Sequence, residues 1–359
     1  MRAMVLTGHG GLEKIEFHQN WPTPVPTPDQ VLIKVGACGL NNTDVNTRSG
    51  WYSKAVSEAT TGGAYDTVDT TDPTWGGAPL TFPRIQGADV AGVVVATGNN
   101  ADPALIGRRV LVDAWLRDWS APENKDGTGY FGSECDGGYA DYTVADRRQV
   151  FPIDSDLSDA ELATFSCSYS TAENLLARVH CAANDRVLIT GASGGVGSAL
   201  IQLANRRGAM TIALASDAKH AAVSALDPDA LLSRSPQDLA GALEQSTGHR
   251  SVTVVADVVG GAYFPTLIDV LERGGRYGTS GAIAGPMVDL DLRTFYLRDL
   301  TFHGCTVTGL DVFPNLVNYI ERGDIKPMLA KTFALEDMHA AQQAFIDKQH
   351  AGNIVVTMD

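Results

Sequence analysis

Polar side chains that can serve catalysis follow an apolar run near the N-terminus. The stretch ACGLNNTDVNTRSGWY, residues 37–52, gathers amide, carboxylate, guanidinium and phenol groups in one short segment. Such a cluster beside a buried strand either carries out chemistry, with or without a metal, or begins a helix. In the second case Asn42 or Thr43 is the N-cap. Arg48 is then solvated, or it pairs with Asp44 four residues earlier. The two uses are compatible.

A glycine-rich turn further along the chain is the strongest motif. Residues 186–209, RVLITGASGGVGSALIQLANRRGA, place a β-rich run, a GxxGxxG turn and a helical pattern in immediate succession. Glycines let backbone N–H groups approach a pyrophosphate, which then lies at the positive end of the helix dipole. The strand–turn–helix context therefore predicts a dinucleotide site. The residues expected to bind the cofactor in this turn are Gly191, Ser193, Gly194, Gly195, Val196 and Gly197.

The end of the next strand indicates which coenzyme this site takes. A coenzyme without a 2′-phosphate normally meets an acidic residue there, whereas this chain has Ala215, then Ser216 and Lys219. A small residue does not repel a phosphate, and a hydroxyl and an ammonium can bind one. The pattern favours NADPH, bound through Ser216 and Lys219. In the alternative, Asp217 serves as the acidic residue, displaced by two positions.

The elements that must position these groups change in character near residue 172. Before it, short β-rich runs such as QVLIKVGACG and DVAGVVVATG are separated by Gly, Pro and Asp. After it, apolar strands alternate with helical stretches such as GSALIQLANRRG and AYFPTLIDVLERGG, which predicts a doubly wound parallel sheet. Two amphipathic helices, VFPNLVNYIERGDI and LEDMHAAQQAFIDKQH, precede a last strand. Residues 54–83 show little periodicity, and a loop of that length is functional or mobile.

Composition excludes several classes of partner. The net charge of −15 over 359 residues argues against nucleic acid, because phosphate binding needs clustered Lys and Arg. No apolar run is long enough to cross a membrane, and the first residues turn too soon to glycine and charge for a signal peptide. We therefore expect a cytoplasmic protein without a membrane partner. The five scattered cysteines contain no CxxC pair, which indicates neither a disulfide framework nor a local zinc cluster.

These features give a resemblance that covers nearly the whole chain. A β-rich front, a nucleotide fold and a tail that returns to the front domain resemble the medium-chain dehydrogenase/reductase superfamily. Within it, GLNNTDVNTRSGWY is similar to the GLNxxDxxxRxGxY stretch of the quinone oxidoreductase branch, and GASGGVG, ADVVGG and GGYADY agree with that placement. The resemblance implies an α/β protein with a GroES-like β-rich catalytic domain, residues 1–172 and 310–359. Residues 173–309 would form a Rossmann domain with a doubly wound parallel sheet.

The same resemblance argues against a metal. Zinc alcohol dehydrogenases of the superfamily carry a Cys at the place of Asn41, a His-Glu pair at Ala88-Asp89, and a Cys at the place of Cys167. Only Cys167 is a good zinc ligand here, whereas catalytic zinc needs three protein ligands and an open position. The four-cysteine structural lobe is also missing, because residues 115–135 contain a single cysteine. We expect no metal, and Cys167 is then most simply a small buried residue, although its retention is unexplained.

Without a metal, the polar cluster still suits a hydride transfer. NADPH would deliver hydride to an enone, enal or quinone, and negative charge would develop on the carbonyl oxygen. Asn41 can stabilise that charge through its amide. The resemblance implies that Tyr52 bonds the carbonyl or supplies a proton, and that Asp44 orients the site or is structural. Asn41, Tyr52 and Asp44 are the predicted catalytic residues.

The resemblance also implies further residues near the nicotinamide. Thr171 would stand where a helix begins, or would only cap that helix. Strand C-termini line the cofactor crevice of such sheets, so the backbone after two strands is expected to face it: Val259, Gly260, Ser280, Gly281 and Ala282. Tyr130 and Trp51 either line the substrate pocket or belong to the core.

The predicted function is a zinc-independent, NADPH-dependent reductase of a quinone or an α,β-unsaturated carbonyl. The resemblance implies a homodimer joined through LTFHGCTV, with a small molecule as substrate. Residues 54–83, longer than the family's loop, are expected to cover the pocket and narrow substrate choice. Two alternatives stay open: a metal-dependent alcohol dehydrogenase that reuses Cys167 and Asp89, and a non-catalytic NADPH-binding protein. The sequence names no substrate and does not separate hydride from one-electron chemistry.

Overall fold

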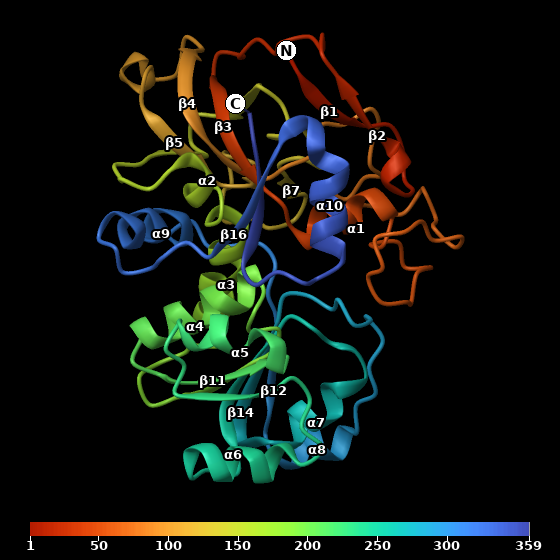
Figure 1. The fold of residues 1–359 in the computed structure, drawn as a ribbon, viewed down its shortest axis with the longest axis vertical. Coiled ribbons are helices and arrows are strands. Elements are labelled where there is room, and N and C mark those ends of the chain that lie inside the picture. The colour runs from red at the N-terminus through yellow and green to blue at the C-terminus, as the bar shows by residue number, and fades with distance from the viewer. Residues whose placement is uncertain (359) are drawn as a thin grey trace. The chain divides into compact units, whose positions relative to one another are not determined.

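The computed structural model describes residues 1–358, which divide into two compact units (Figure 1). Unit 1 comprises Met1–Val56, Thr61–Cys167 and the chain from Gly309 onward. Unit 2 comprises Ser57–Thr60 and Ser168–Thr308. Residues 1–358 contain no helix whose length and apolar character would carry it across a membrane. The cytoplasmic location expected from the sequence stays a prediction.

A mostly antiparallel sheet forms the centre of unit 1. Within residues 1–358 it has seven strands in the order β16-β17-β3-β4-β5-β9, with β8 also paired to β3. The bounds are β3 Gln30–Gly39, β4 Asp89–Thr97, β5 Arg109–Val112, β8 Tyr142–Asp146, β9 Val150–Pro152, β16 Leu329–Ala334 and β17 Asn353–Thr357. Two small hairpin-like pairs accompany it: β1 Ala3–Leu6 with β2 Ile15–His18, and β6 Trp115–Leu116 with β7 Gly129–Tyr130. The expected β-rich first domain is confirmed.

The strand β3 leads the chain into the polar cluster. Its first residues alternate between buried and less buried, as a strand with one face in a core does, and its last three residues are all buried. Helix α1, Asn42–Ser49, follows at once and ends at Gly50, whose φ of 79° is the left-handed conformation common after helices. β3 pairs with β4 so that Gly39 lies opposite Asp89. This register brings the two polar segments together.

The other helices of unit 1 are short and amphipathic. They are α2 Asp159–Leu162, α9 Val312–Glu321 and α10 Met338–Ile346, while α3, Ser166–Arg178, begins at the end of unit 1 and continues in unit 2. The apolar side chains of α9, among them Phe313 and Leu316, are buried, and Phe313 packs against Phe151 of β9. The two amphipathic helices expected near the C-terminus are therefore confirmed.

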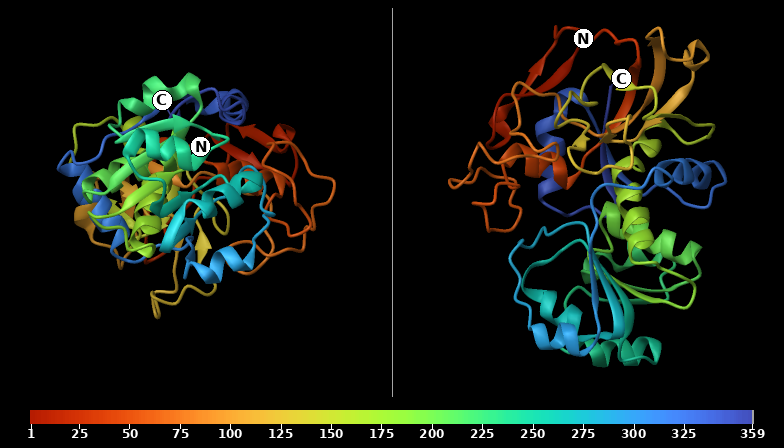
Figure 2. Two further views of the ribbon diagram at one scale, coloured as in Figure 1. Left: turned by 90° about the horizontal axis from the view of Figure 1, so that it is seen from below. Right: turned by 180° about the vertical axis from the view of Figure 1, so that it is seen from behind.

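Unit 2 holds a parallel sheet with six strands among the described residues, in the order β12-β11-β10-β13-β14-β15. The strands are β10 Arg186–Ile189, β11 Met210–Ala215, β12 Ala230–Ser233, β13 Val252–Asp257, β14 Leu271–Thr279 and β15 Thr301–Gly304. The helices are α4 Gly195–Arg206, α5 His220–Ser224, α6 Leu239–Thr247, α7 Phe264–Asp269 and α8 Leu292–Leu297. All pairings are parallel, and Figure 2 shows helices flanking the strands. This is the doubly wound Rossmann arrangement that the sequence predicted.

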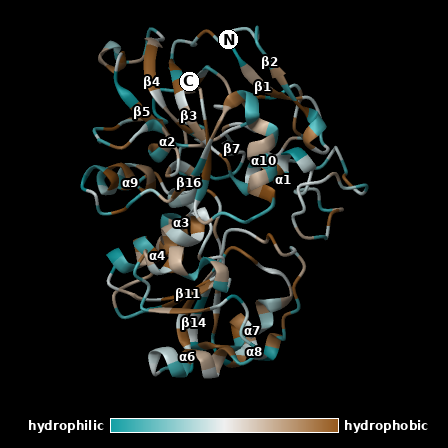
Figure 3. Cartoon of the chain, in the orientation of Figure 1, coloured by the Kyte–Doolittle hydropathy of each residue, from teal (hydrophilic) through white to brown (hydrophobic). Residues whose placement is uncertain are grey.

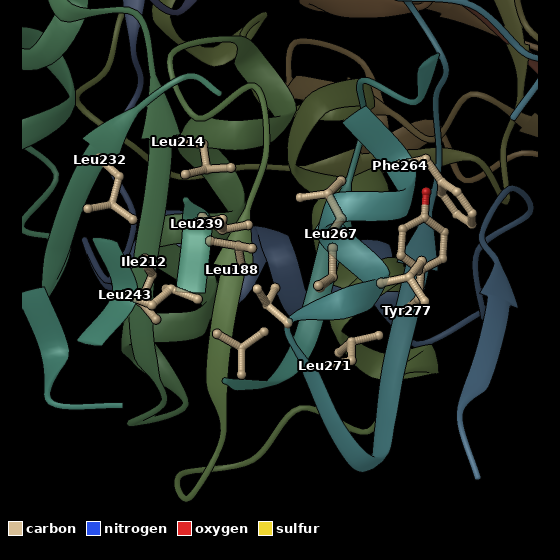
Figure 4. Close-up of a cluster of buried hydrophobic side chains, with 14 of the residues drawn as sticks. Leu188, Ile212, Leu214, Leu232, Leu239, Leu243, Phe264, Leu267, Leu271 and Tyr277 are labelled. Atoms are coloured by element: carbon tan, nitrogen blue, oxygen red, sulfur yellow. The ribbon is translucent and has the colours of Figure 1, made fainter. Parts of the chain in front are cut away.

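The core of unit 2 explains why its strands are apolar throughout. On one face of the sheet, Leu188 and Tyr277 pack with Leu243 of α6 and Leu267 of α7 (Figure 4). The neighbour of Tyr277 in β14, Gly278, points to the opposite face, where a Cβ would come within 3.1 Å of the Leu175 side chain of α3. Both faces are thus covered, which requires strands without polar alternation. The strands accordingly appear hydrophobic in Figure 3.

Some elements of unit 2 differ from the sequence prediction. The helix expected over AYFPTLIDVLERGG ends at Asp269, because Leu271 already pairs with Val252 as the start of β14. Gly274 has a φ of 76° and lies within that irregular strand, so the glycines turn β14 rather than end a helix. Helix α5, strand β12 and helix α6 were not predicted.

Candidate active site

Asp89 is the centre of the polar site in unit 1. Its Oδ2 accepts a hydrogen bond from Asn41 Nδ2 at 2.9 Å, and its Oδ1 accepts from the backbone N–H of Cys167 at 2.6 Å. The side chain is fully buried. Burial raises the pKa of Asp89 to about 7, although the bonds from Asn41 and Cys167 oppose that rise. The sequence considered Asp89 only as a metal ligand, whereas the structure shows it holding two other site residues.

Asp44 orients the start of α1. Its Oδ2 accepts from the backbone N–H of Asn41 and from the Tyr139 hydroxyl, each at 2.8 Å. Gln86 Nε2 donates to the Asp44 carbonyl at 3.0 Å. Burial raises the pKa of Asp44 to about 6, although the hydrogen bonds from Asn41 and Tyr139 to its carboxylate oppose that rise. Asp44 therefore fixes the backbone of Asn41, while Asp89 fixes its side chain.

Two expectations about α1 are wrong. Asn41, rather than Asn42 or Thr43, is the N-cap residue, because the helix already begins at Asn42. Arg48 is neither solvated nor paired with Asp44, whose carboxylate is committed to Asn41 and Tyr139. The Arg48 side chain is fully buried, and the loss of water lowers its pKa.

Buried Arg48 joins three segments that are distant in the sequence. It donates to the carbonyls of Gly10 and Gly62, at 2.6 and 2.9 Å, and to Gln342 Oε1 of α10 at 3.0 Å. Figure 1 shows α1 and α10 near each other, as this bond requires. Gly62 belongs to the long loop, and a Cβ there would come within 2.5 Å of Ile346. Arg48 thus anchors the loop of residues 54–83.

Tyr52 follows helix α1 in the chain. It is partly buried, and burial raises its pKa to about 12. Hydrogen bonds with Thr43 and Asn46 oppose that rise. The ring lies edge-on to Trp51 and Trp75, with centroids 5.5 and 5.0 Å apart.

Cys167 connects the polar site to aromatic side chains. Burial raises the pKa of the Tyr130 phenol well above its usual range, and the charge of Cys167 and a hydrogen bond with it add to the rise. The Tyr130 ring is buried against Trp115, with centroids 5.0 Å apart, and lies 5.9 Å from Trp75. This placement gives Cys167 a role as a link between Asp89 and Tyr130. Trp75 was not predicted, although it is the only tryptophan in the long loop.

The donors present in unit 1 do not fit a catalytic zinc. In residues 1–358 no three His, Cys, Asp or Glu side chains converge as a metal site. The nearest set is Cys167, Asp89 and Asn41, and both Asp89 oxygens already accept hydrogen bonds from the other two. One thiol with an amide and a committed carboxylate is short of the three ligands that catalytic zinc requires.

The glycine turn of unit 2 fits a pyrophosphate. Gly191 has a φ of 57°, and a Cβ on Gly197 would lie 2.2 Å from the Gly191 carbonyl oxygen. The helix N-terminus is therefore held close to the turn by the absence of side chains. α4 begins at Gly195, so the N–H groups of its first turn, including those of Val196 and Gly197, lack intrahelical acceptors. Ser193 lies in this turn and Gly194 is exposed at the helix start, a position that suits an anion.

Cations gather at the end of β11. Ser216 follows this strand, and Lys219 lies in the turn after it. Burial and then the positive charge of Arg234 lower the pKa of Lys219, which shows that the two cations are close. The Asp217 carboxylate accepts from Ser233 Oγ at 2.7 Å. Arg234 follows β12, a strand that the sequence did not predict, and was missed for that reason.

Asp257 organises the strand ends at β13 and β14. Its carboxylate accepts from Thr190, from Tyr277 and from the backbone N–H of Val259, the last at 2.8 Å, while the Gly260 N–H also points to it. The Ser280 Oγ, just past β14, is buried and without a partner in the described part of the chain. A polar ligand group can satisfy it. Gly281 and Ala282 continue the same turn.

Thr171 is not where a helix begins. It lies in the sixth position of α3, Ser166–Arg178, so it is neither the start nor the cap of that helix. Separately, a pocket of about 190 Å³ in unit 1 is lined by residues including Leu116, Trp119 and Cys135. Neither Asn41 nor Tyr52 lines it, so this pocket is distinct from the polar site.

Comparisons with known proteins bear on the identity of the chain. The alcohol dehydrogenase GroES-like domain model matches residues 27–155, and the zinc-binding dehydrogenase model matches residues 195–322. A solved protein of Sinorhizobium meliloti, provisionally named an alcohol dehydrogenase, is 45% identical with a TM-score of 0.90, over 100% of this chain and 97% of that one.

Curated relatives carry different activities. The quinone oxidoreductase of Homo sapiens is 25% identical over 96% of this chain and 94% of its own length. The NADPH-dependent alkenal/one oxidoreductase of Arabidopsis thaliana is 26% identical over 99% and 79%. The NAD-dependent alcohol dehydrogenase of Sulfolobus acidocaldarius is 27% identical over 95% of each chain. The chain belongs to the medium-chain dehydrogenase/reductase superfamily, in its quinone oxidoreductase-like branch, and is a pyridine-nucleotide-dependent oxidoreductase.

Proposed function

We propose that this protein is a zinc-independent, NADPH-dependent reductase of a quinone or an α,β-unsaturated carbonyl. The observation that carries the proposal is the double commitment of Asp89 to Asn41 and Cys167. These two hydrogen bonds occupy the carboxylate oxygens that a metal would need, and the first of them orients the Asn41 amide. That amide keeps a second N–H, because a side-chain amide nitrogen has two hydrogens.

The chain's own groups then handle charge and protons. When bound, the reduced nicotinamide supplies a hydride, so that NADPH, a proton and a quinone become NADP⁺ and a hydroquinone. The free N–H of Asn41 donates to the acceptor oxygen as negative charge develops there. Tyr52, which stays protonated at neutral pH, donates its hydrogen to that oxygen or supplies the proton. Asp44 and Asp89 are positioning residues, because both act through Asn41.

The preference for NADPH rests on charge at the end of β11. Lys219 and Arg234 lie close together there, and Ser216 precedes the turn that contains Lys219. A 2′-phosphate gains charge-assisted hydrogen bonds from such groups. The pyrophosphate would be held at Gly191 to Gly197, and the nicotinamide end by the backbone at Val259, Gly260 and Ser280 to Ala282.

The proposed partners are the small-molecule acceptor and a second copy of the chain, with neither nucleic acid nor membrane. In the described chain β15 pairs with β14 alone, so its other edge is open. Just before it, Leu292, Tyr296 and Leu297 of α8 are more than half exposed. Sedimentation velocity should give a dimer, and Tyr296→Asp with Leu297→Asp should give monomers. A monomeric unmodified protein would exclude the homodimer.

The decisive experiment is NADPH oxidation with quinones, enals and enones, before and after dialysis against a chelator, with NADH in parallel. We expect turnover that is indifferent to the chelator and faster with NADPH. Alcohol oxidation lost on chelation and restored by zinc would overturn the proposal in favour of a metal-dependent alcohol dehydrogenase. Tight NADPH binding without turnover of any acceptor would indicate a non-catalytic protein.

A further inference from the structure

Trp75 and the three aromatic rings that it contacts form a group that we name the aromatic cluster: Tyr52, Trp75, Trp115 and Tyr130. Trp51 touches this group through Tyr52. Trp75 is in the middle, with centroid distances of 5.0 Å to Tyr52 and 5.9 Å to both Trp115 and Tyr130. The first and second contacts are edge-to-face, at interplanar angles of 65° and 90°. Tyr52 lies in the turn after α1, and Trp115 and Tyr130 belong to the β6–β7 pair. Only Trp75 belongs to the long loop of residues 54–83.

A single carboxylate holds Trp75 in the cluster. Glu134 Oε1 accepts from the Thr74 hydroxyl and from the Gly76 N–H, the second at 2.9 Å, so it binds the residues on both sides of Trp75. Its Oε2 accepts from the Tyr130 N–H at 2.7 Å. Glu134 therefore connects the backbone at Trp75 to the backbone at Tyr130. These bonds fix the loop where it contributes its aromatic ring.

The other end of the loop is fixed independently. Asp72 Oδ2 accepts from the Ser53 hydroxyl at 2.6 Å and from the Lys54 N–H at 2.8 Å. Arg48 binds the Gly62 carbonyl, as described above. A loop with three anchors presents Trp75 in a defined position, and a rigid aromatic side chain gives contact area at little cost in conformational entropy.

The aromatic cluster adjoins the proposed hydrogen-bond donors. Tyr52 belongs to both, because its hydroxyl is the proposed donor and its ring contacts Trp75. Tyr130 is hydrogen-bonded to Cys167, whose N–H binds the same Asp89 that holds Asn41. An acceptor whose carbonyl oxygen meets Asn41 and Tyr52 must place its carbon frame beside these rings.

We propose that Trp75 is a specificity-determining residue that selects flat aromatic quinones over open-chain enals, and that Glu134 positions it. The inference rests on the proposed function and names the acceptor class within it. A planar ring system stacks on aromatic side chains or meets their edges, whereas a flexible chain gains less from them. The long loop therefore adds recognition through one ring rather than by covering the site alone.

The test compares 1,4-naphthoquinone with 2-hexenal as acceptors for Trp75→Ala, Trp75→Phe and Trp119→Ala. Trp119 lies between β6 and β7 and stacks with Arg148 outside the aromatic cluster. It is therefore the matched control. Trp75→Ala should lower kcat/KM for naphthoquinone about tenfold and for hexenal less than about twofold, the size of one lost aromatic contact. Trp75→Phe should retain most of the preference, and Trp119→Ala all of it. Equal losses for both acceptors, or none, would overturn the inference.

Glu134 is tested by its dependence on Trp75. Glu134→Gln should raise KM for naphthoquinone about threefold with kcat unchanged, and should add nothing in the Trp75→Ala background, because both act through one ring. Additive effects would refute the positioning role. The NADPH dissociation constant and the thermal midpoint confirm that each variant is folded.

A binding measurement separates this inference from the proposed function. Calorimetric binding of 1,4-naphthoquinone should weaken about tenfold in Trp75→Ala whether or not the protein turns it over. Unchanged naphthoquinone affinity would overturn the selection by Trp75 even if both acceptors are reduced. Absence of turnover with unmodified protein would count against the proposed function, and the affinity difference would still decide the role of Trp75.

Discussion

The polar site of unit 1 and the glycine turn of unit 2 are constructed in opposite ways. The glycine turn uses backbone groups from one continuous segment, and its key contact, Gly197 against the Gly191 carbonyl, spans six residues. The polar site uses side chains from remote segments: Asn41, Asp89 and Cys167 meet through buried hydrogen bonds. A backbone site depends on local conformation, whereas a side-chain site depends on strand register and on charges kept from water. The glycine turn should therefore tolerate substitutions of exposed side chains, whereas the polar site should be sensitive to the loss of a single functional group.

The largest expected effect is at the side-chain site. Asn41→Ala should lower kcat for quinone reduction about a hundredfold, the usual loss when one preplaced donor to a developing oxyanion is removed. The NADPH dissociation constant should not change. Asn42→Ala is the matched control, because Asn42 is the next amide but binds Lys348 at the surface. Equal activity in the two variants would remove Asn41 from the mechanism.

The buried carboxylate of that site predicts a pH dependence of stability. Because the folded pKa of Asp89 is raised from 3.8 to about 7, the folded state holds a proton that the unfolded chain releases. Its contribution to stability is therefore present at low pH and is lost as pH rises from about 4 to about 7. From pH 5.5 to 8, Asp89→Asn should gain about 2 kcal/mol in unfolding free energy relative to the unmodified protein. Denaturant titrations at both values measure it, and a constant difference would contradict a raised pKa.

The backbone site should respond to volume instead of charge. Gly197→Ala should weaken NADPH binding about tenfold, since its methyl would lie 2.2 Å from the Gly191 oxygen and must displace the helix N-terminus. In Gly194→Ala the methyl would be 3.4 Å from that oxygen, an ordinary contact, so this variant should bind nearly normally. Fluorescence titration with NADPH distinguishes the two. Equal weakening would mean that close packing does not define the turn.

The smallest effect is expected at the two cations near the end of β11 in unit 2. Lys219→Ala and Arg234→Ala should each lower the preference for NADPH over NADH about fivefold, the loss of one charge-assisted bond to phosphate. Steady-state kinetics with both coenzymes give the ratio. Unchanged NADH use on Asp217→Ala would fit this picture, whereas a collapse of NADH binding would favour the alternative in which Asp217 binds the ribose. In that case coenzyme binding in unit 2 would depend on a carboxylate side chain as well as on backbone groups.

The sequence predicted much of unit 2 and less of the polar site. The strand–glycine–helix succession is visible within one window, and the parallel sheet followed from strands without alternation. The prediction was wrong where the local hydrophobic pattern and strand pairing favoured different structures. The residues LERGG fit the end of a helix by their pattern, but they form the first part of strand β14. Arg48 was expected to be solvated because charged residues usually are, and only the fold shows the carbonyls that it binds.

By itself the sequence determined the superfamily, the order of the domains and the residues at the glycine turn, because these depend on neighbours within a few positions. Tertiary structure decided that Asp89 holds Asn41, that Cys167 links to Tyr130, and that Trp75 joins the aromatic cluster. Those contacts join residues tens of positions apart. They depend on the pairing of β3 with β4 and on the three sets of hydrogen bonds that hold the loop of residues 54–83. No local periodicity reports such pairings, because the free energy that selects them comes from burial and hydrogen bonding between distant segments.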